Sequence, residues 1–464
     1  MTQFPGSPVS AFWHPFADMS QVAGHDFVLA SGDGVYVTNE EGRRYLDSTA
    51  GLWYCNVGHG RESIGQAVME QMSRIASFSN FGDLATRPTL DLADRLSALA
   101  PMPGAKVFFT SGGSDAVDTA VKLVRRYWAV KGREDRTVII TRSRAYHGMH
   151  FAGTALAGIP ANRDGYGPLD MDVANVAWDD AEALAATIDS IGADRVAAFF
   201  CEPVIGAGGV YLPPAGYLKR VREICAERGV LFVADEVICG YGRTGKMFAS
   251  EGLDPDLVLT AKGLTSGYQP MGAVLIAGRV AEPFWTTPGL LWRHGYTYSG
   301  HACAAAAAMA NLDIIEKEGL VDRVATNQVA LTAALIGLRD HSWVVDVRSG
   351  MGLLAAVTID PQILAGDPST MNRLILALRE EGVISRGLAD GSLQISPPFI
   401  ITREEMQFLG GAIDRALTAL GSTRPAGSSS GLDEVPLLPE LVSEDAGGLG
   451  SLDASLRENV PPHH

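Results

Sequence analysis

The sequence predicts an α/β protein with a large unit built on a mostly parallel β-sheet and a smaller α+β unit after it. Between about residues 60 and 315, apolar strand-like runs alternate with helical stretches. These runs are continuously apolar, which is typical of parallel strands covered by helices on both faces. From about residue 343, short strand-like runs accompany one helical stretch, a pattern that favours a separate α+β unit. A chain of 464 residues also exceeds one typical hydrophobic core, so two units are expected.

Each element of the two units is predicted from a local pattern. The helix after the run "KVFFT" carries Val117, Val121, Val124 and Trp128 at three- and four-residue spacing, as one buried helix face requires. The alanine-dominated stretch that starts at His301 is too short to span a bilayer, so a tightly packed helix is expected there. Strands are expected in the large unit at 106–110, 137–142, 195–204, 230–237 and 256–260, with a helix at 216–229. In the small unit, strands are expected at 343–348, 353–359 and 392–398, with a helix at 370–382.

Composition narrows the class of function. The chain carries 37 basic and 53 acidic residues, a formal net charge of −16, and it contains no long basic run. This balance argues against a nucleic-acid partner or an anionic membrane surface. Five scattered cysteines without a CxxC pair favour free thiols in a reducing cytosol. The N-terminal stretch shows no signal peptide, so a cytoplasmic location is expected.

The C-terminal stretch 421–464 has a different composition from the rest. It is rich in glycine, serine, proline and acids and has little to bury, which predicts a disordered acidic tail. Seven acids and two arginines there contribute −5 to the net charge. The apolar run "VPLLPELV" leaves a short docking peptide as the alternative.

The first candidate for a binding site is the stretch "FFTSGGSDAVDTA" (108–120). A strand that enters a glycine turn and then a helix presents unpaired backbone N–H groups at the positive end of the helix dipole, which suits a phosphate. Gly112 and Gly113 permit close approach, and the Ser114 hydroxyl adds a hydrogen bond. The alternative is that Ser114 only caps the helix while Asp115 favours its first turn. The sequence does not separate these two interpretations.

Two charged side chains are expected at the ends of buried strands. Asp235 ends the run "VLFVAD", and ligands bind at the carboxyl ends of the strands in open α/β sheets. Lys262 follows "DLVLT", and a desolvated lysine has a lowered pKa and becomes a nucleophilic amine. The alternatives are a salt bridge or loop cap for Asp235 and a surface position for Lys262.

Two aromatic side chains follow the strand at 137–142. Tyr146 and His147 offer flat rings that stack on a planar ligand. An ordinary core or rim aromatic is the simpler interpretation of Tyr146 taken alone.

Other motifs carry less weight. The run "GYGRTG" (240–245) matches G-x-G-x-x-G, but the long helix that a dinucleotide site requires does not follow it. The ten histidines show no HExxH or paired His/Cys spacing, so no metal site is expected. The absence of G-x-S-x-G disfavours a serine hydrolase.

The candidate features together describe the binding of one cofactor. A phosphate-binding turn, a stacking aromatic, a strand-end aspartate and a strand-end lysine are what pyridoxal phosphate (PLP) requires. The lysine forms a Schiff base with this cofactor, and the aspartate keeps the pyridine nitrogen protonated so that the ring accepts electrons. PLP is therefore the expected cofactor.

Several long segments also carry a family resemblance. They are "FFTSGGSDAVDTA", "AYHGM", "CEPVIGAGGVYLPPAGYLKRVREICAERGVLFVADEVICGYGRTGKMFASE", "PDLVLTAKGLTSGYQPMGA" and "HGYTYSGHACAAAAA". Over roughly residues 10–420 the sequence resembles the class III (omega) aminotransferases of PLP fold type I. The resemblance implies a large PLP-binding domain with a mostly parallel seven-stranded sheet and a smaller α+β domain. The implied division is 1–60 (contributing to the small domain and the substrate entrance), 61–315 (large domain), 316–420 (small domain) and 421–464 (tail).

The resemblance assigns roles to individual residues. Lys262 is the catalytic lysine that binds the cofactor and moves the substrate proton, and Asp235 pairs with the pyridine nitrogen. A homodimer with shared active sites is implied, with a tetramer left open. The further cofactor contacts that the resemblance implies are Gly113 and Ser114 (phosphate), Tyr146 and Val237 (ring faces), His147, Glu202, and Thr297 from the partner subunit.

Departures from the family pattern favour one branch of it. Ile238 stands where the ornithine, acetylornithine and GABA branches carry a glutamine, and Ala207 stands where GABA-type enzymes carry a gating glutamate. Both departures favour the omega-amino acid or amine:pyruvate branch.

The same branch implies a set of substrate contacts. Phe16 and Trp53 resemble the apolar walls of its substrate entrance, and Tyr146 also faces the substrate. Arg386 resembles the mobile arginine that binds the keto-acid carboxylate. For Arg386, a surface salt bridge is the alternative that the bare sequence favours.

The expected activity is PLP-dependent transamination by a ping-pong mechanism. An omega-amino acid or amine is the expected donor and a keto acid, pyruvate, the expected acceptor. A diaminopelargonate-type aminotransferase and an aminomutase are alternatives of the same fold. A nicotinamide-dependent oxidoreductase and a silent PLP-binding regulator are alternatives from other classes. The regulator is disfavoured because both Asp235 and Lys262 are present.

Overall fold

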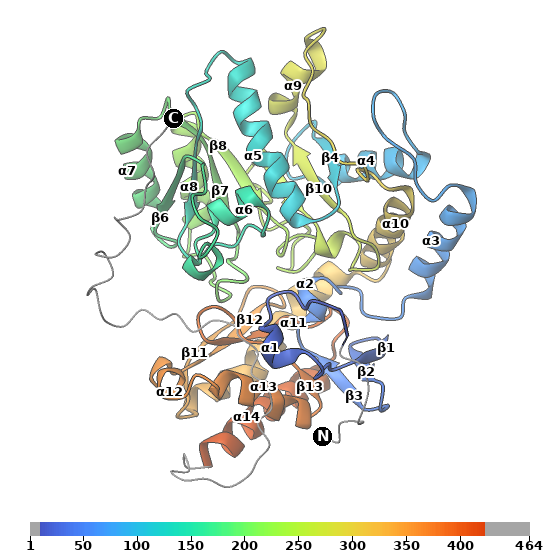
Figure 1. Cartoon of the computed structure of the whole chain (residues 1–464), viewed down its shortest axis with the longest axis vertical. Coiled ribbons are helices and arrows are strands. Elements are labelled where there is room, and N and C mark those ends of the chain that lie inside the picture. Colours follow the sequence, from blue (N-terminus) through green and yellow to red (C-terminus); the bar gives the residue numbers. More distant parts are fainter. Residues whose placement is uncertain (1–9, 423–464) are drawn as a thin grey trace, which may run out of the picture.

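The computed structural model describes residues 10–422. A large sheet with its helices forms the upper part of the molecule in Figure 1, and two small sheets with the C-terminal helices form the lower part. The strands of the large sheet, in spatial order, are β4 (Lys106–Thr110), β10 (Gly272–Ile276), β9 (Leu257–Thr260), β8 (Leu231–Asp235), β7 (Val196–Cys201), β5 (Val138–Arg142) and β6 (Val173–Val176). The prediction of a mostly parallel seven-stranded sheet is confirmed.

The pairing within the large sheet departs from parallel at one strand. β10 runs antiparallel to both β4 and β9, with Ala273 opposite Thr260, and the remaining pairs are parallel. Every residue of β5, β7, β8 and β9 is buried, which is why these strands read as continuous apolar runs. β6 lies at the sheet edge with one buried residue, so its sequence lacks that pattern.

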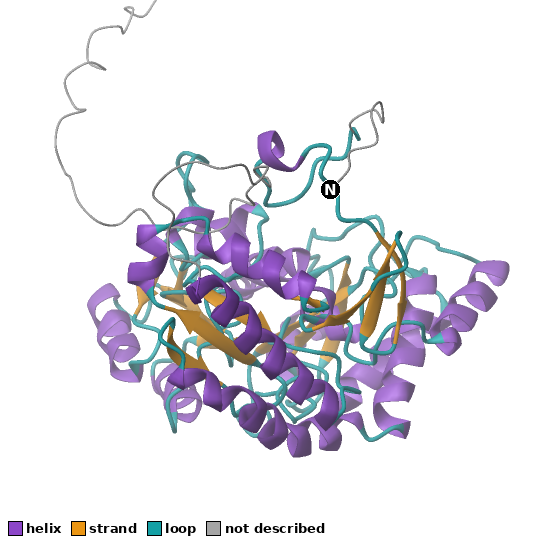
Figure 2. Cartoon of the chain, turned by 90° about the horizontal axis from the view of Figure 1, so that it is seen from below, coloured by secondary structure: helices purple, strands orange, loops and turns teal. Residues whose placement is uncertain are grey.

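Helices cover both faces of the large sheet (Figure 2). The predicted face of α5 is confirmed, since Val117, Val121 and Val124 are buried and Trp128 packs against the same core. The alanine-rich stretch forms α10, which packs against α3 and α4. No helix within residues 10–422 combines the length and the hydropathy that a membrane crossing needs. The helices of this part are α3 (Glu62–Arg74), α4 (Arg87–Leu99), α5 (Gly113–Val130), α6 (Phe151–Leu156), η1 (Pro160–Asn162), α7 (Ala181–Ile191), α8 (Tyr217–Glu227), η2 (Lys262–Leu264), α9 (Gly278–Thr286) and α10 (Ala302–Lys317).

The small sheets combine segments from both ends of the chain. One contains β1 (Leu29–Asp33), β2 (Tyr36–Asn39), β3 (Arg44–Asp47) and β13 (Val383–Ile384), and the other contains β11 (Val344–Arg348), β12 (Ala355–Ile359) and β14 (Ser392–Ile395). β3 pairs in parallel with β13, so the N-terminal segment lies against the C-terminal one (Figure 1). The accompanying helices are α1 (Met19–Val22), α2 (Ala50–Trp53), α11 (Leu320–Leu335), η3 (Ile336–Asp340), α12 (Pro361–Gly366), α13 (Thr370–Glu380) and α14 (Arg403–Ser422).

The last helix extends slightly past the boundary that was expected for the small domain. α14 continues to Ser422, two residues beyond the expected end of the small domain at 420, and the remainder of the predicted tail lies outside the described residues. All five cysteines are free, and all five are buried.

A buried arginine joins three segments of the chain. Arg243, in the "GYGRTG" turn, is 0% exposed and its guanidinium stacks on the Phe399 ring with Cζ 4.6 Å from the centroid. It donates to Pro397 O at 2.6 Å and to Asn56 Oδ1 at 2.7 Å, and also to Leu353 O at 3.2 Å. Residues 240–250 form turns and not the helix that a dinucleotide site requires. Through Arg243, the motif instead joins separate segments of the chain.

Replacing this arginine is expected to destabilise the protein. Arg243→Lys leaves at least one of its buried acceptors without a donor, which costs about 1–3 kcal/mol for each such group. We therefore expect a lower midpoint in urea unfolding. Arg220→Lys, which alters exposed ion pairs with Glu182 and Glu227, is the control and is expected to change stability by less than about 1 kcal/mol. Equal midpoints for the two variants would contradict the structural role of Arg243.

Candidate active site

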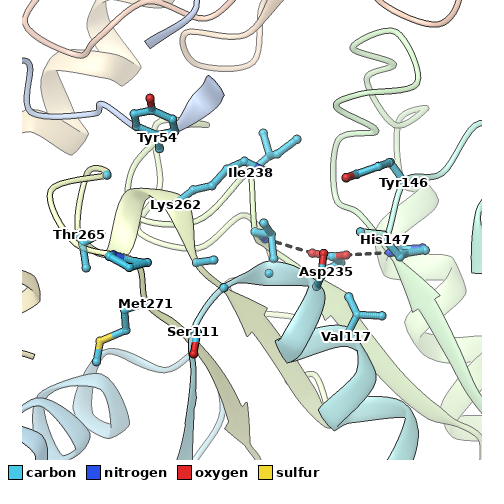
Figure 3. A pocket seen from close by; sticks show the side chains of 18 of the residues that line it. Tyr54, Ser111, Val117, Tyr146, His147, Asp235, Ile238, Lys262, Thr265 and Met271 are labelled. Carbon is cyan, nitrogen blue, oxygen red and sulfur yellow. Dashed lines mark hydrogen bonds and ion pairs between the residues drawn. The ribbon is translucent and has the colours of Figure 1, made fainter. Parts of the chain in front are cut away.

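A cavity of about 340 Å³ lies where β8 and β9 end, beside the N-terminus of α5 (Figure 3). This is the edge of the sheet at which the sequence places the strand-end charges. Eight of the predicted site residues line it: Gly113, Ser114, Tyr146, His147, Glu202, Asp235, Val237 and Lys262. Ligands of open α/β sheets bind at this edge.

The glycine turn before α5 is open toward an anion. Gly112 occupies the N-cap position of the helix and brings no side-chain acceptor to the first turn, so the N–H groups there stay available. The Ser114 hydroxyl does not cap the helix, because it accepts a hydrogen bond from Met149 N at 3.1 Å. A Cβ atom on Gly113 would lie only 2.9 Å from Val237 Cγ1, so glycine is required for this approach. Of the two interpretations of the turn, the structure favours the anion site.

Asp235 is held by neighbours at the end of β8. Its carboxylate is 4% exposed, and Oδ2 lies 2.7 Å from His147 Nδ1 while Oδ1 accepts from Val237 N at 3.1 Å, as the dashed lines in Figure 3 mark. Because a carboxylate only accepts, the proton of this bond lies on Nδ1. The other ring nitrogen of His147 is 3.1 Å from Thr141 Oγ1. The salt-bridge alternative for Asp235 is thus partly right, yet the carboxylate also lines the cavity.

Lys262 presents its amine to the cavity from a constrained backbone. Burial lowers the pKa of the amine to about 8, against the opposing effects of Asp235 and Glu202, and Arg386 lowers it further. Its φ of +43° is uncommon for a residue with a side chain. The Nζ atom makes no hydrogen bond to residues 10–422 and lies 5.7 Å from the centroid of the Trp53 ring. The surface-lysine alternative is wrong, because the side chain lines the cavity.

Glu202 and Tyr146 form the wall beside His147. The carboxylate of Glu202 is 3% exposed and accepts from Tyr146 N at 2.9 Å and Gly206 N at 3.0 Å. Burial raises the pKa of Glu202, and it also raises the pKa of the Tyr146 hydroxyl. These bonds fix the backbone from which Tyr146 projects (Figure 3).

The remaining predicted residues lie outside the cavity wall. Trp53 is 3% exposed and lies near both the lysine and Arg386, whose Cζ is 5.4 Å from the Trp53 centroid. Phe16 and Thr297 are exposed and do not line the cavity within this chain.

The cavity also contains residues that the sequence reasoning did not select. Tyr54 lines it next to Trp53, and Thr265, Gln269 and Met271 line it from the loop that follows Lys262. Their sequence signal is only their adjacency to residues that were selected. Within the described ranges, no group of three or more histidine, cysteine or acidic residues is placed to hold a metal ion.

These residues fit PLP. The uncapped helix N-terminus suits the phosphate, the buried carboxylate suits a protonated ring nitrogen, and the amine with a lowered pKa suits the aldehyde. A Cβ atom on Gly112 would meet nothing within 4 Å, so the turn has open space for the phosphate at this position.

Comparison with known proteins decides the family. The model of the family "Aminotransferase class-III" matches residues 19–417. The chain belongs to the class-III aminotransferases. It is therefore a transaminase, and its cofactor is PLP.

Individual relatives and solved structures support the same family assignment. The putrescine–pyruvate aminotransferase of Pseudomonas aeruginosa is 38% identical over 420 residues, covering 85% of this chain and 91% of the relative. The crystal structure of a transaminase from the marine bacterium Virgibacillus has a TM-score of 0.84 at 37% identity, covering 89% of this chain and 97% of that one. A PLP-bound amine transaminase from an uncultivated Pseudomonas species has a TM-score of 0.82 at 36% identity, covering 88% and 99%.

The lowered pKa of Lys262 predicts a pH profile for its chemical modification. Only the neutral amine reacts with an acylating reagent, so labelling of Lys262 in the cofactor-free aminotransferase is expected to rise with pH and level off above about pH 8. Peptide mass spectrometry measures the rate at each pH, with the exposed Lys219 as the reference amine. A Lys262 profile that follows an ordinary lysine, whose pKa is 10.5, would contradict the effect of burial.

Proposed function

We propose that this aminotransferase moves an amino group from an omega-amino acid or amine to pyruvate by a ping-pong mechanism. The observation that carries the proposal is the placement of Lys262 and Arg386 against one Trp53 ring, at 5.7 and 5.4 Å. The amine of Lys262 and the guanidinium of Arg386, which we propose binds the keto-acid carboxylate, thus lie near the same apolar ring. The buried, apolar Ile238 in the cavity wall and the putrescine–pyruvate activity named for a relative support the same substrate class.

Different residues of the chain have different roles in the proposed reaction. When bound, PLP supplies an electrophilic carbon and a ring that delocalises the electron pair released at the substrate carbon. With PLP bound, Lys262 Nζ would accept the proton that leaves the substrate carbon and would donate it again in the second proton transfer. The Asp235 carboxylate, oriented by His147, holds a proton on the ring nitrogen.

Other residues in the proposal bind and orient. The first-turn N–H groups at Gly113, with the Ser114 hydroxyl, bind the phosphate. Tyr146 and Val237 cover the two faces of the ring. Glu202 supports the backbone of Tyr146 beside the ring.

The proposal extends to the assembly and its location. We propose a cytoplasmic homodimer in which the partner's Thr297 reaches the phosphate, because Thr297 is exposed and does not line the cavity of its own chain. Phe16, 53% exposed, is proposed as part of a substrate entrance. In this division residues 61–315 bind the cofactor, while 1–60 and 316–420 surround the entrance.

A donor screen tests the reaction. The PLP-loaded enzyme is expected to form alanine from pyruvate with putrescine or an omega-amino acid, with the parallel kinetic lines of a ping-pong mechanism. Lys262→Ala is expected to lower the rate by about 10³-fold or more, and Asp235→Asn by about 10²-fold, with cofactor still bound. Turnover without any keto acid would favour an aminomutase, and amine oxidation that requires a nicotinamide would favour an oxidoreductase. Near-normal transfer by Lys262→Ala would overturn the assignment.

A split between substrates tests Arg386. Arg386→Ala is expected to raise the KM for pyruvate about 10- to 100-fold, because a charge-assisted contact to the carboxylate is lost. The KM for an amine that lacks a carboxylate is expected to change less than about threefold. Arg87→Ala removes an exposed arginine and serves as the control. Equal losses for both substrates would indicate that Arg386 is only structural.

A further inference from the structure

The backbone between β3 and the cavity adopts an unusual conformation. Ala50, Gly51 and Trp53 have φ values of +48°, +66° and +59°, and Leu52 between them is not helical either. Positive φ is uncommon for residues with side chains and is an outlier for a bulky one such as tryptophan. Such a turn persists only where its surroundings hold it in place.

This turn delivers two aromatic rings to the active site. Trp53 lies against Lys262 and Arg386, and Tyr54 lines the cavity above Lys262 in Figure 3. The buried Nε1 of Trp53 has no hydrogen-bond partner among the described residues, and the Tyr54 hydroxyl makes no hydrogen bond to them. Neither ring is anchored by its own polar atom, so the position of both depends on the backbone and on packing.

One buried carboxylate holds the turn. Asp47 is 3% exposed, and its Oδ1 accepts from Thr49 N at 3.0 Å and Thr49 Oγ1 at 2.8 Å. Its Oδ2 accepts from Gly51 N at 2.7 Å and lies 2.9 Å from His59 Nε2. Burial acts to raise the pKa of Asp47, but the hydrogen bonds from His59, Thr49 and Gly51 lower it overall, which keeps the acceptor charged. Four contacts thus converge on one side chain.

The position of the Tyr54 ring depends on the conformation of the turn, because the ring is closely packed against it. A Cβ atom on Gly51 would lie 2.3 Å from Tyr54 Cζ, and one on Gly267 would lie 2.3 Å from Tyr54 Cδ2. The ring is therefore wedged between its own turn and the loop that follows Lys262. A side chain at position 51 therefore requires the Tyr54 ring to move.

We propose that Asp47 is a positioning residue for the substrate pocket. It holds the turn at Ala50–Trp53, in which three of the four residues have positive φ, and so sets Trp53 near the Lys262 amine and Tyr54 in the cavity wall. The inference rests on the proposed function for the identity of the pocket, but the link from Asp47 to the two rings is structural. Loosening the turn alters the shape of the pocket and leaves Lys262 and Asp235 in place.

The test combines kinetics with a spectroscopic signal in the PLP-loaded enzyme. Asp47→Asn keeps the shape of the side chain but removes the charge and turns an N–H group toward the donors of Thr49 or Gly51. The KM for the amine donor is expected to rise at least about fivefold, with kcat changed less than about twofold. In protein labelled with 5-fluorotryptophan, the ¹⁹F resonance of Trp53, assigned by Trp53→Phe among the seven tryptophans, is expected to shift or broaden.

Two further variants and a control separate positioning from stability. Gly51→Ala disturbs the same turn while leaving the Asp47 side chain unchanged, and it is expected to shift the same resonance. Asp180→Asn removes a carboxylate that also accepts two backbone N–H groups, at the start of α7, and is expected to change neither readout. A lower melting temperature for Asp47→Asn with an unchanged KM and an unchanged Trp53 resonance would overturn the proposal.

The outcome stays decisive if Asp47→Asn does not fold. His59→Gln removes only one of the four contacts, and a shift of the Trp53 resonance away from its wild-type position supports the proposal. An unmoved resonance in His59→Gln and Gly51→Ala contradicts it. The resonance is independent of turnover, so an enzyme inactive with every donor would refute the proposed substrates without refuting the role of Asp47.

Discussion

The site depends on keeping one amine away from water while its counter-charges stay nearby. Burial disfavours the charged form of Lys262, and the carboxylates of Asp235 and Glu202 favour it. None of these groups hydrogen-bonds the amine, so their effect is electrostatic and leaves the nitrogen available for chemistry. The bonds of Asp235 to His147 and Val237, and of Glu202 to Tyr146 and Gly206, hold the acids in place.

The fold supplies this arrangement through strand ends. β8 delivers Asp235, β9 delivers Lys262, and the turn after β4 starts α5 at the same edge of the sheet. Trp53 and Tyr54 come from the N-terminal segment, which is tied to the C-terminal strands by β3–β13 pairing and to the "GYGRTG" turn by the Arg243–Asn56 bond. The chemistry and the shape of the pocket therefore come from different parts of the chain.

Much of this was predictable because it is local in the sequence. Buried strands read as apolar runs, and a charged residue at the end of such a run is conspicuous, so Asp235 and Lys262 were found. The Asp235–His147 bond joins residues 88 positions apart, and no local pattern reports such a pairing. Tyr54 was missed for a related reason: the ordinary sequence "GLWYCN" gives no sign of the positive φ values that turn its ring to the cavity. The edge strand β6, which is only partly buried, and the fully buried strand β10 were both missed.

The antiparallel return of β10 beside β9 has an evolutionary consequence. Thr260 and Ala273 are paired neighbours, so the loop from 261 to 271 leaves the sheet and comes back to the same place. Any insertion or deletion there must be absorbed within a closed segment that also carries the reactive amine. Family members should therefore conserve the length of this loop strictly, and diversify their substrate range through insertions elsewhere around the entrance.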